Sequence, residues 1–486
     1  MSKLYIFGIG GTGSRVLKSL TMLLSAGVKI HADEIVPVII DPDHAAADLT
    51  RTVKLMRDYN KVYDKISHSN SSKNQFFRTK INLDILPSVT LPITNTLDVD
   101  FKEYIGLSEM RDEAGKHNSN YALTSMLFSE KNLNAKMDVG FKGNPNIGSV
   151  VLNQIAQSDE FKKLIVSFRQ DDRIFIISSI FGGTGASGFP LLMKNLRAIK
   201  QDVAGNNFVK NAIIGAISVL PYFDVAPDPE KMSEIDSSTF ISKTKAALSY
   251  YDRNMTEANA LYYVADNISK QYKNSEGGTN QRNDAHFAEL IAALAAIDFA
   301  WMTDLKTENG KPLGQPIYRE FGIKNEAKEL TFSDLEERTK QTIKKPMTQF
   351  TIFCKFLDEQ IFESYRKQVW ALRHKIDDTF IHSQAFSSDL MDIKKTWFEW
   401  LNEMANNCRA FAPFDLKKSK DQVFELIKDE KPYKSIFILK NNYELFDDNL
   451  NGLESGVKDD QSKPLQSFLE LFFLATEKLV NSKFRM

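Results

Sequence analysis

The stretch of sequence that decides the fold is FGGTGASGFP, residues 181–190. It follows the apolar run RIFIISSI (173–180) and precedes the helical pattern LLMKNLRAIK (191–200). A strand that delivers small residues to the start of a helix gathers backbone N–H groups and the positive end of the helix dipole at one point. Glycine leaves room for a phosphate there, and the hydroxyls of Thr184 and Ser187 can add donors. The segment therefore predicts a phosphate-binding turn.

Composition excludes several classes of function. The chain has 486 residues, enough for two to four domains, and its 62 Lys and Arg nearly balance 63 Asp and Glu. The protein therefore has no net charge large enough to attract nucleic acid or a membrane surface. The two cysteines, Cys354 and Cys408, form neither a disulfide framework nor a cysteine metal site. No apolar stretch approaches the roughly 20 residues of a membrane span, and the chain starts directly with a strand pattern, so we expect a cytoplasmic protein.

Apolar strand patterns alternate with helical patterns in the N-terminal part of the chain. This alternation is typical of a doubly wound α/β domain with a mainly parallel sheet, which we assign to residues 1–301. A polar insertion at 50–137 is available to protein partners. The domain ends in a strongly apolar pattern at 280–301, which predicts a buried central helix. We expect a linker or loop at 302–330 and a divergent, helix-rich C-terminal domain at 331–486, whose helices are a second possible partner surface.

A second glycine motif, GIGGTGSR (8–15), follows the first strand pattern. Its glycine spacing also fits a Rossmann dinucleotide site, so an NAD(P) oxidoreductase is one alternative. That alternative expects an acidic residue about 20 positions further on, and Asp41 or Asp43 would serve only at a longer spacing. It also leaves the glycine turn at 182 unexplained.

Six motifs of residues 3–300, taken in order, resemble the tubulin/FtsZ superfamily. They are similar to its first phosphate loop, its acidic loop, the loop over the γ-phosphate, the glycine signature, the turn beside the ribose and the next strand: GIGGTGSRVLKSL (8–20), VIIDPDHAA (38–46), GFKGNPNIGSVV (140–151), FGGTGASGFP (181–190), SVLPYF (218–223) and NALYYVADN (259–267). The chain departs from the signature at Phe181, which replaces its first glycine, and at Ser187, which replaces its last.

The resemblance implies a site for GTP or GDP with Mg²⁺. The residues that it assigns to the α- and β-phosphates and to the loops around them are Gly10, Gly11, Thr12, Ser14, Asp41, Asp43, Gly182, Gly183, Thr184, Gly185 and Ser187. Those that it assigns to the γ-phosphate are Gly143, Asn144 and Gly148. Those that it assigns to the ribose and the base are Pro221, Asp266, Asn267, Asn283 and Asp284.

The resemblance also implies head-to-tail assembly into filaments, with GTP hydrolysis at the subunit interface. Acidic residues after the central helix would orient water on the nucleotide of the next subunit, in the pattern NxDFxxD. The match is poor: ELTFSDLEER (329–338) offers Asp334, while Asp298 and Asp304 lie nearer the end of the helix. Helix capping by the acidic segment is an equal alternative. A nucleotide-binding scaffold or switch with little hydrolysis, and a structural assembly module with a vestigial site, are therefore further alternatives.

Overall fold

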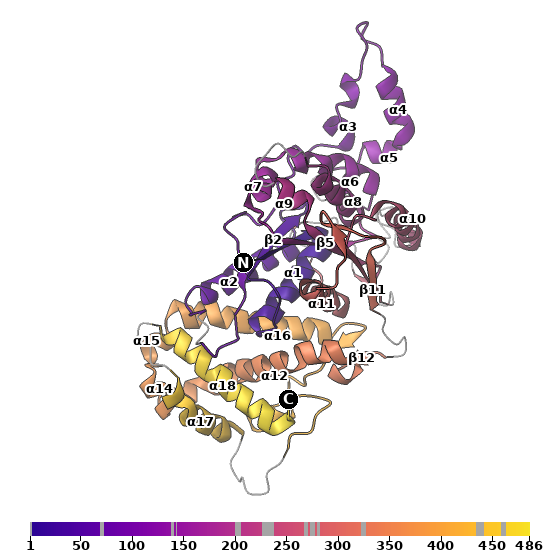
Figure 1. Cartoon of the computed structure of the whole chain (residues 1–486). Coiled ribbons are helices and arrows are strands. Elements are labelled where there is room, and N and C mark those ends of the chain that lie inside the picture. The colour runs from indigo at the N-terminus through magenta and orange to yellow at the C-terminus, as the bar shows by residue number, and fades with distance from the viewer. Residues whose placement is uncertain are drawn as a thin grey trace.

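The fold is described from a computed structural model of the chain. The residues that it describes are 2–68, 72–137, 140–141, 143–199, 206–225, 238–266, 271–272, 278, 282–321, 327–433, 442–457 and 463–486. They form a sheet covered by helices on both faces, an arm that projects from one face, and a block of helices packed on the other face (Figure 1).

The centre of the molecule is a seven-stranded sheet with the strand order β11–β7–β5–β4–β1–β2–β3, in which every pair of neighbours is parallel. Its strands are β1 (Lys3–Ile9), β2 (Glu34–Ile40), β3 (Lys80–Ile81), β4 (Arg173–Ser179), β5 (Ile213–Val219), β7 (Ala260–Val264) and β11 (Ile317–Phe321). Five of these strands are almost wholly buried apolar runs, as a sheet covered on both faces requires. The expected doubly wound α/β class is confirmed.

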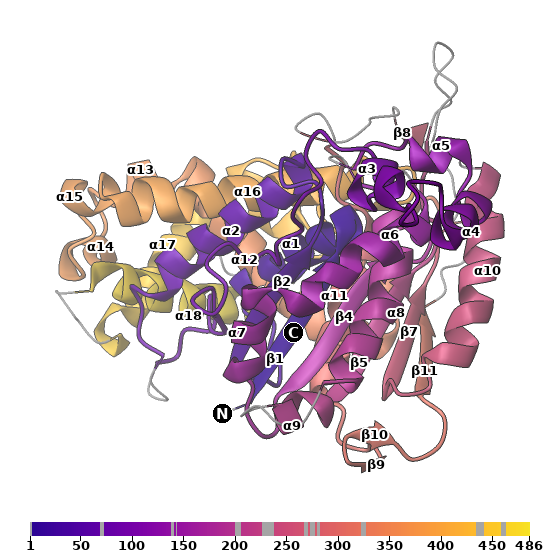
Figure 2. The same cartoon turned by 90° about the horizontal axis from the view of Figure 1, so that it is seen from above.

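The two faces of the sheet belong to separate hydrophobic cores. In β1, Leu4 and Ile6 enter one core while Tyr5 and Phe7 enter the other, because successive side chains of a strand point to opposite faces. The helices of the first face are α1 (Gly10–Ser25), α2 (Ala47–Tyr63) and α11 (Phe287–Trp301). Those of the second face are α6 (Pro145–Leu152), α7 (Asp159–Ser167), α8 (Gly183–Arg197), α9 (Asn206–Lys210) and α10 (Ser238–Asn254), shown from above in Figure 2.

Helix α11 is the central helix expected from the sequence. All but two of its residues are buried, because it packs on α1 and on strands β4, β5 and β7, in a core that continues into the C-terminal helices. Its start is fixed by a capping box: the Nδ1 atom of His286 accepts from the Ala288 N–H, and the Glu289 carboxylate accepts from the His286 N–H, both at 3.0 Å. The helix therefore begins at Phe287, a few residues later than the apolar pattern suggests.

The C-terminal part is rich in helices, as expected. The longest are α12 (Glu337–Glu359), α16 (Met391–Ala405), α17 (Asn442–Leu453) and α18 (Pro464–Phe484). Aromatic rings fill the space between them, and the same core continues into the first face of the sheet. Trp400 of α16, for example, donates from its indole N–H to the Ser19 hydroxyl of α1 at 3.1 Å.

Two segments differ from the expectation. Residues 50–63 are part of α2, which packs on α1, and β3 joins the sheet. The first third of the expected insertion therefore belongs to the α/β domain itself. The projecting arm is only 101–134, with α3 (Phe101–Tyr104), α4 (Ser119–Leu127) and α5 (Glu130–Leu133). The expected linker contains β9 (Thr307–Glu308), β10 (Lys311–Pro312) and β11. An edge strand alternates in burial, so β11 lacks the continuous apolar run that identifies a central strand.

None of the helices among the described residues has the length and hydropathy needed to cross a membrane.

Candidate functional site

The carboxyl ends of the parallel strands share one edge of the sheet, and most of the site residues expected from the sequence follow these ends. The glycine loops after β1 and β4, the acidic loop after β2 and the turn after β5 all start there. The topology therefore brings together segments as far apart in the sequence as Gly10 and Pro221. In open α/β sheets, this carboxyl edge is where ligands bind.

The loop after β1 passes directly into α1. Gly10 has φ +69°, a backbone angle that glycine tolerates best, and α1 starts without a side-chain cap or an acidic residue in its first turn. Gly13 serves packing instead: a Cβ there would lie 2.4 Å from the carbonyl carbon of Gly8. A Cβ added to Gly11 would have only the Arg15 guanidinium nearby, at 3.3 Å. The first N–H groups of α1 have no partner within the helix and no side-chain cap, so they are available to an anion.

The loop after β4 repeats this arrangement. Helix α8 starts after Gly182, again without a side-chain cap and without an acidic residue in its first turn. Gly185 lets the helix approach the strand, since its Cβ would lie 2.3 Å from the Ser179 carbonyl oxygen. The two helix starts meet at Thr184, whose Cβ lies 3.6 Å from the position of a Cβ on Gly10. Two positive helix ends without side-chain caps therefore converge at one point.

The loop 140–148 closes the same point from the side. A Cβ on Gly140 would lie 4.0 Å from the Thr184 hydroxyl, and one on Gly183 would lie 3.1 Å from the Gly143 amide nitrogen. The Asn144 carboxamide caps α6 by accepting from the Asn146 N–H at 3.2 Å. The expected γ-phosphate loop thus packs against the start of α8, with Asn144 already used as a helix cap.

The two departures from the glycine signature leave this point open. The Phe181 ring is buried in the core, edge-on to the rings of Tyr222 and Phe223. Ser187 is also buried, and its hydroxyl donates back to the Gly183 carbonyl at 2.7 Å. A Cβ on Gly148 would lie 2.3 Å from that hydroxyl, so Ser187 fills the contact between α8 and α6.

The acidic loop after β2 holds two buried carboxylates. Asp43 accepts from the Ala45 N–H and, at 2.6 Å, from the Gly278 N–H, while its own N–H donates to Asp41 at 3.1 Å. Burial, helped by the charges of Asp43 and Asp48, raises the pKa of Asp41 to about 7. Among the described residues, no three acidic, His or Cys side chains gather as a metal cluster.

The residues expected near the base are mostly engaged by the protein itself. Asp266 pairs with Arg409 of the C-terminal part at 2.5 Å and faces His286 at 3.6 Å. Asn283 accepts from Arg51 through its backbone carbonyl at 2.9 Å. Asp284 follows it, half-buried, before α11. Asn267 lies outside the described residues.

Sequence reasoning missed the buried polar cluster beside the first glycine loop. Arg15 donates to Glu289 of α11 at 2.5 Å, to Asp48 of α2 at 2.8 Å, to the Tyr222 hydroxyl at 2.7 Å and to the Thr12 hydroxyl at 3.3 Å. Burial alone would lower the pKa of Arg15, but these neighbours raise it well above its usual value, so the guanidinium stays charged. The only local signal was an arginine inside a glycine motif.

Two further expected residues lie around this cluster. Ser14 is fully buried in α1, and its hydroxyl finds no hydrogen-bond partner among the described residues. Pro221 is also buried and precedes Tyr222 in the turn after β5. In the chain, Ser14 thus adjoins Arg15 and Pro221 adjoins Tyr222, two members of the cluster.

Neither a family model nor a curated protein matches the sequence. Among solved structures, CetZ from Methanosaeta thermophila strain DSM 6194 is 16% identical over 55% of this chain and 46% of its own, with a TM-score of 0.27. The GTPγS-bound protofilament of CetZ2 from Haloferax volcanii is 13% identical over 63% and 60%, with a TM-score of 0.28.

In this chain, the motifs that resemble the tubulin/FtsZ superfamily occur in order along the sequence. The loops expected to hold the phosphates meet at one edge of a parallel sheet. The fold is a doubly wound α/β fold.

The three acidic residues that the resemblance offers for catalysis do not reach the glycine loops of their own chain. Helix α11 ends at the opposite edge, where Arg173, the first residue of β4, donates to the carbonyls of Phe299 and Met302. Asp304 follows this end and is exposed. Figure 2 shows the β9–β10 hairpin beyond this edge, opposite α3 and α5.

The other two acids are engaged locally. Asp298 accepts from the Tyr262 hydroxyl at 2.7 Å and pairs with Arg319 and Arg338 at 3.3 and 3.0 Å. Asp334 forms a capping box with Thr331, whose N–H and hydroxyl both donate to it at 2.8 Å. Asp304 is therefore the candidate whose carboxylate forms no hydrogen bond or ion pair with the described residues.

Proposed function

We propose that this protein is a tubulin/FtsZ-like protein that binds a guanine nucleotide at the carboxyl edge of its sheet. The observation that carries the proposal is the meeting of two helix starts without side-chain caps, α1 and α8, at Thr184. Two such helix ends can hold adjacent phosphates of one nucleotide with backbone N–H groups. The choice of guanine rests on the resemblance of the motifs, and the protofilament of CetZ2, which carries GTPγS, is consistent with it.

We further propose head-to-tail assembly, with hydrolysis at the contact between subunits. The glycine loops lie at one edge of the sheet and Asp304 lies at the opposite edge. Translation of one copy along the strand direction therefore brings Asp304 of that copy towards the phosphates of the next. Repetition of such a contact generates a filament, because it does not close on itself.

Mg²⁺ would accompany the nucleotide rather than occupy a site of its own. Asp41 and Asp43 are the nearest acidic pair in the loops, and both already accept backbone hydrogen bonds. Mg²⁺ in such sites is typically held by phosphates, water and one or two carboxylates. When bound, the ion would neutralise charge on the phosphates.

A second candidate is a nucleotide-dependent switch or scaffold with little hydrolysis. The observation that favours it is the engagement of Asp298 in ion pairs and of Asp334 in a capping box, which leaves Asp304 to act without an acidic neighbour of the expected pattern. The two candidates share the binding site and differ only in turnover.

The test is to titrate the purified protein with GTP, ATP and NAD separately, measuring binding by calorimetry and, in parallel, phosphate release and pelleting. The proposal expects binding of GTP and pelleting that depends on it; binding of NAD without GTP contradicts it. Pelleting with GTP and no phosphate release identifies the switch.

A substitution at the meeting point locates the site. Thr184→Arg places a long side chain between the two helix starts and is expected to abolish nucleotide binding. Ser482→Arg adds the same side chain on the exposed surface of α18 and is the matched control. If Thr184→Arg binds nucleotide with normal affinity, the phosphates do not bind between these two helix starts.

A further inference from the structure

Glu403, in the last turn of α16, connects the C-terminal part to the first face of the sheet. Its side chain is 10% exposed. One carboxylate oxygen accepts from Arg51 of α2 at 2.8 Å, and the other accepts from Lys18 of α1 at 2.9 Å. The second oxygen also accepts from the Ala285 N–H, at 3.0 Å. Burial alone would raise the pKa of Glu403, but Lys18 and Arg51 hold it below its usual value, so the carboxylate stays charged.

The segment that leads into α11 is held in place through its backbone. The Ala285 N–H donates to Glu403, and the Ala285 carbonyl accepts from the carboxamide of Asn407, just after α16, at 3.1 Å. The Asn283 carbonyl accepts from Arg51 at 2.9 Å. Because Arg51 is itself paired with Glu403, this one carboxylate fixes the segment directly at Ala285 and indirectly at Asn283.

Asp48 connects this segment to the first glycine loop. Its carboxylate accepts from Arg51 at 2.9 Å and from the Asn283 N–H at 3.4 Å. It also accepts from Arg15 at 2.8 Å, and Arg15 donates to the Thr12 hydroxyl of the loop. Only two side chains, Asp48 and Arg15, therefore separate Asn283 from the loop that would hold phosphates.

The side chain of Asn283 is not used in this network. Asn283 is half-buried, and its carboxamide forms no hydrogen bond with the described residues. A carboxamide carries donors and an acceptor side by side, which is the pattern that pairs with the edge of a base. Because the backbone of Asn283 is already fixed at its N–H and its carbonyl, binding through this carboxamide would cost little further ordering of the chain.

We propose that Glu403 is a positioning residue of the nucleotide site, which holds Asn283 in place to bind the base and so helps to select guanine over adenine. The inference rests on the proposed binding of a guanine nucleotide and on the expected contact of Asn283 with its base. It makes the end of α16 a part of the site. Without α16, Ala285 would lose both of its partners and Arg51 one of its two carboxylates.

The first test is Glu403→Gln, which keeps the size of the side chain. Both carboxylate oxygens accept from donors, so the amide nitrogen of a glutamine faces a donor whichever way it turns. The dissociation constants of GTP and ATP are measured by calorimetry, with ATP competing against GTP. The ratio of the ATP constant to the GTP constant should fall at least about tenfold, because GTP binds more weakly. A role in stability alone would change both constants by the same factor and leave the ratio unchanged.

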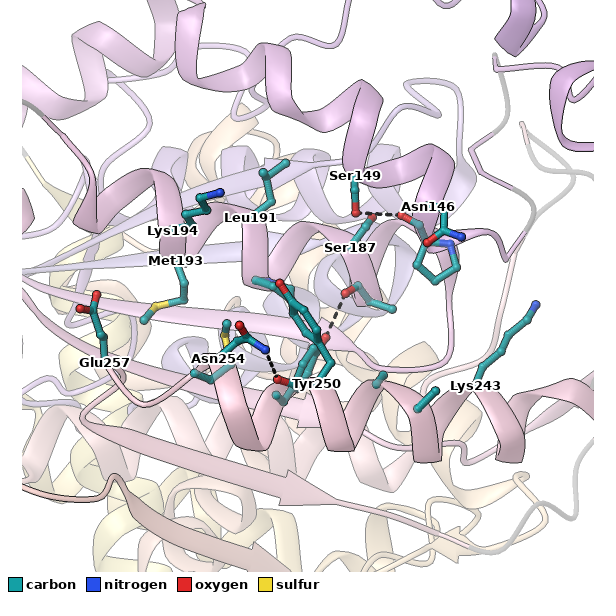
Figure 3. A pocket seen from close by; sticks show the side chains of 17 residues that line it. Asn146, Ser149, Ser187, Leu191, Met193, Lys194, Lys243, Tyr250, Asn254 and Glu257 are labelled. Atoms are coloured by element: carbon teal, nitrogen blue, oxygen red, sulfur yellow. Dashed lines mark hydrogen bonds between the residues drawn. The ribbon is translucent and has the colours of Figure 1, made fainter. Parts of the chain in front are cut away.

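Two control variants should keep the wild-type ratio. Glu257→Gln makes the same change at a carboxylate that is also paired, with Lys311. Glu257 lies on the second face of the sheet, in the groove between α6, α8 and α10 (Figure 3). Trp400→Phe removes the hydrogen bond from α16 to Ser19 of α1. It should lower the melting temperature, because it weakens the contact between these helices without touching the segment before α11.

Two further variants test the path from Glu403 to the base. Asn407→Ala removes only the bond to the Ala285 carbonyl and should lower the ratio about threefold, even if Glu403→Gln does not fold. Asn283→Ala should lower the ratio by itself. Adding Glu403→Gln to Asn283→Ala should then change the ratio by less than about twofold, because residues that act as a unit are not additive.

The outcomes separate this inference from the proposed function. A wild type that does not bind GTP contradicts the proposed function. A wild type that binds GTP, with a ratio that Glu403→Gln and Asn407→Ala leave unchanged or that Trp400→Phe lowers equally, overturns this inference alone. So does a wild type that binds GTP and ATP alike, or a full effect of Glu403→Gln in the Asn283→Ala background.

Discussion

The Nε atom of Arg15 lies 2.5 Å from a carboxylate oxygen of Glu289, and the two side chains are 5% and 1% exposed. This ion pair joins the second turn of α1, just after the glycine loop, to the first turn of the central helix α11. Because Thr12 of the loop also contacts Arg15, the position of the loop depends on the position of α11.

Arg15→Met should lower the free energy of unfolding by about 3–5 kcal/mol, because it leaves a buried carboxylate without its charge partner. Urea denaturation followed by circular dichroism measures the loss. Adding Glu289→Met to this variant should recover part of it, since the double variant buries no unpaired charge at that contact. Equal stability of Arg15→Met and the wild type would show that the pair contributes nothing.

The glycines of the first loop should separate into packing and binding positions. Gly13→Ala should destabilise the fold by about 1–3 kcal/mol or more, because its Cβ has no space beside Gly8. Gly11→Ala should cost less stability than Gly13→Ala, because its Cβ would approach only the Arg15 guanidinium, at 3.3 Å, and it should weaken GTP binding by occupying space beside the first N–H groups of α1. Thermal unfolding measures the stability of both variants, and calorimetric titration measures their GTP affinity. The division into packing and binding positions is refuted if both variants lose only stability or both lose only affinity.

Asp41 should make the protein less stable as the pH rises. Its pKa is about 7 in the folded chain, against 3.8 ordinarily, so the native state holds a proton that the unfolded state releases. The free energy of unfolding therefore falls as the pH rises from about 4 to about 7, by at most about 1.4 kcal/mol per pH unit, and is then level.

Asp41→Asn should flatten this profile and be more stable than the wild type at pH 8. Unfolding curves between pH 4 and pH 8 measure it. Glu160→Gln, half-buried in the first turn of α7, is the control and should keep the wild-type profile. A variant profile as steep as that of the wild type would assign the dependence to other groups.

Asp304→Ala should slow GTP turnover while leaving GTP affinity intact, because the acid lies at the opposite edge from its own glycine loops. Mixing it with Thr184→Arg should restore part of the turnover, since the second variant binds no nucleotide but supplies Asp304 to its neighbour. Each variant alone should release little phosphate. Failure of the mixture to exceed the sum of the two would argue against a site shared between subunits.

Local patterns predicted the parts of the fold that short segments encode. The glycine turns at 10 and 182 each join a strand to a helix. Because the strands are parallel, both turns then lie at the same edge of the sheet. The central helix was also visible, because most of its surface is apolar. Helix α2 was missed because charged residues interrupt its apolar face, and β11 because an edge strand alternates.

The candidate site divides in the same way. The sequence alone determined which backbone segments can approach phosphates, since glycine and a following helix fix that locally. Only the tertiary structure decided which side chains are already engaged. Arg15 and Glu289 are 274 residues apart, and Asp266 meets Arg409 across 143 residues. No periodicity encodes such pairs, because buried charges find their partners only when separate elements pack together.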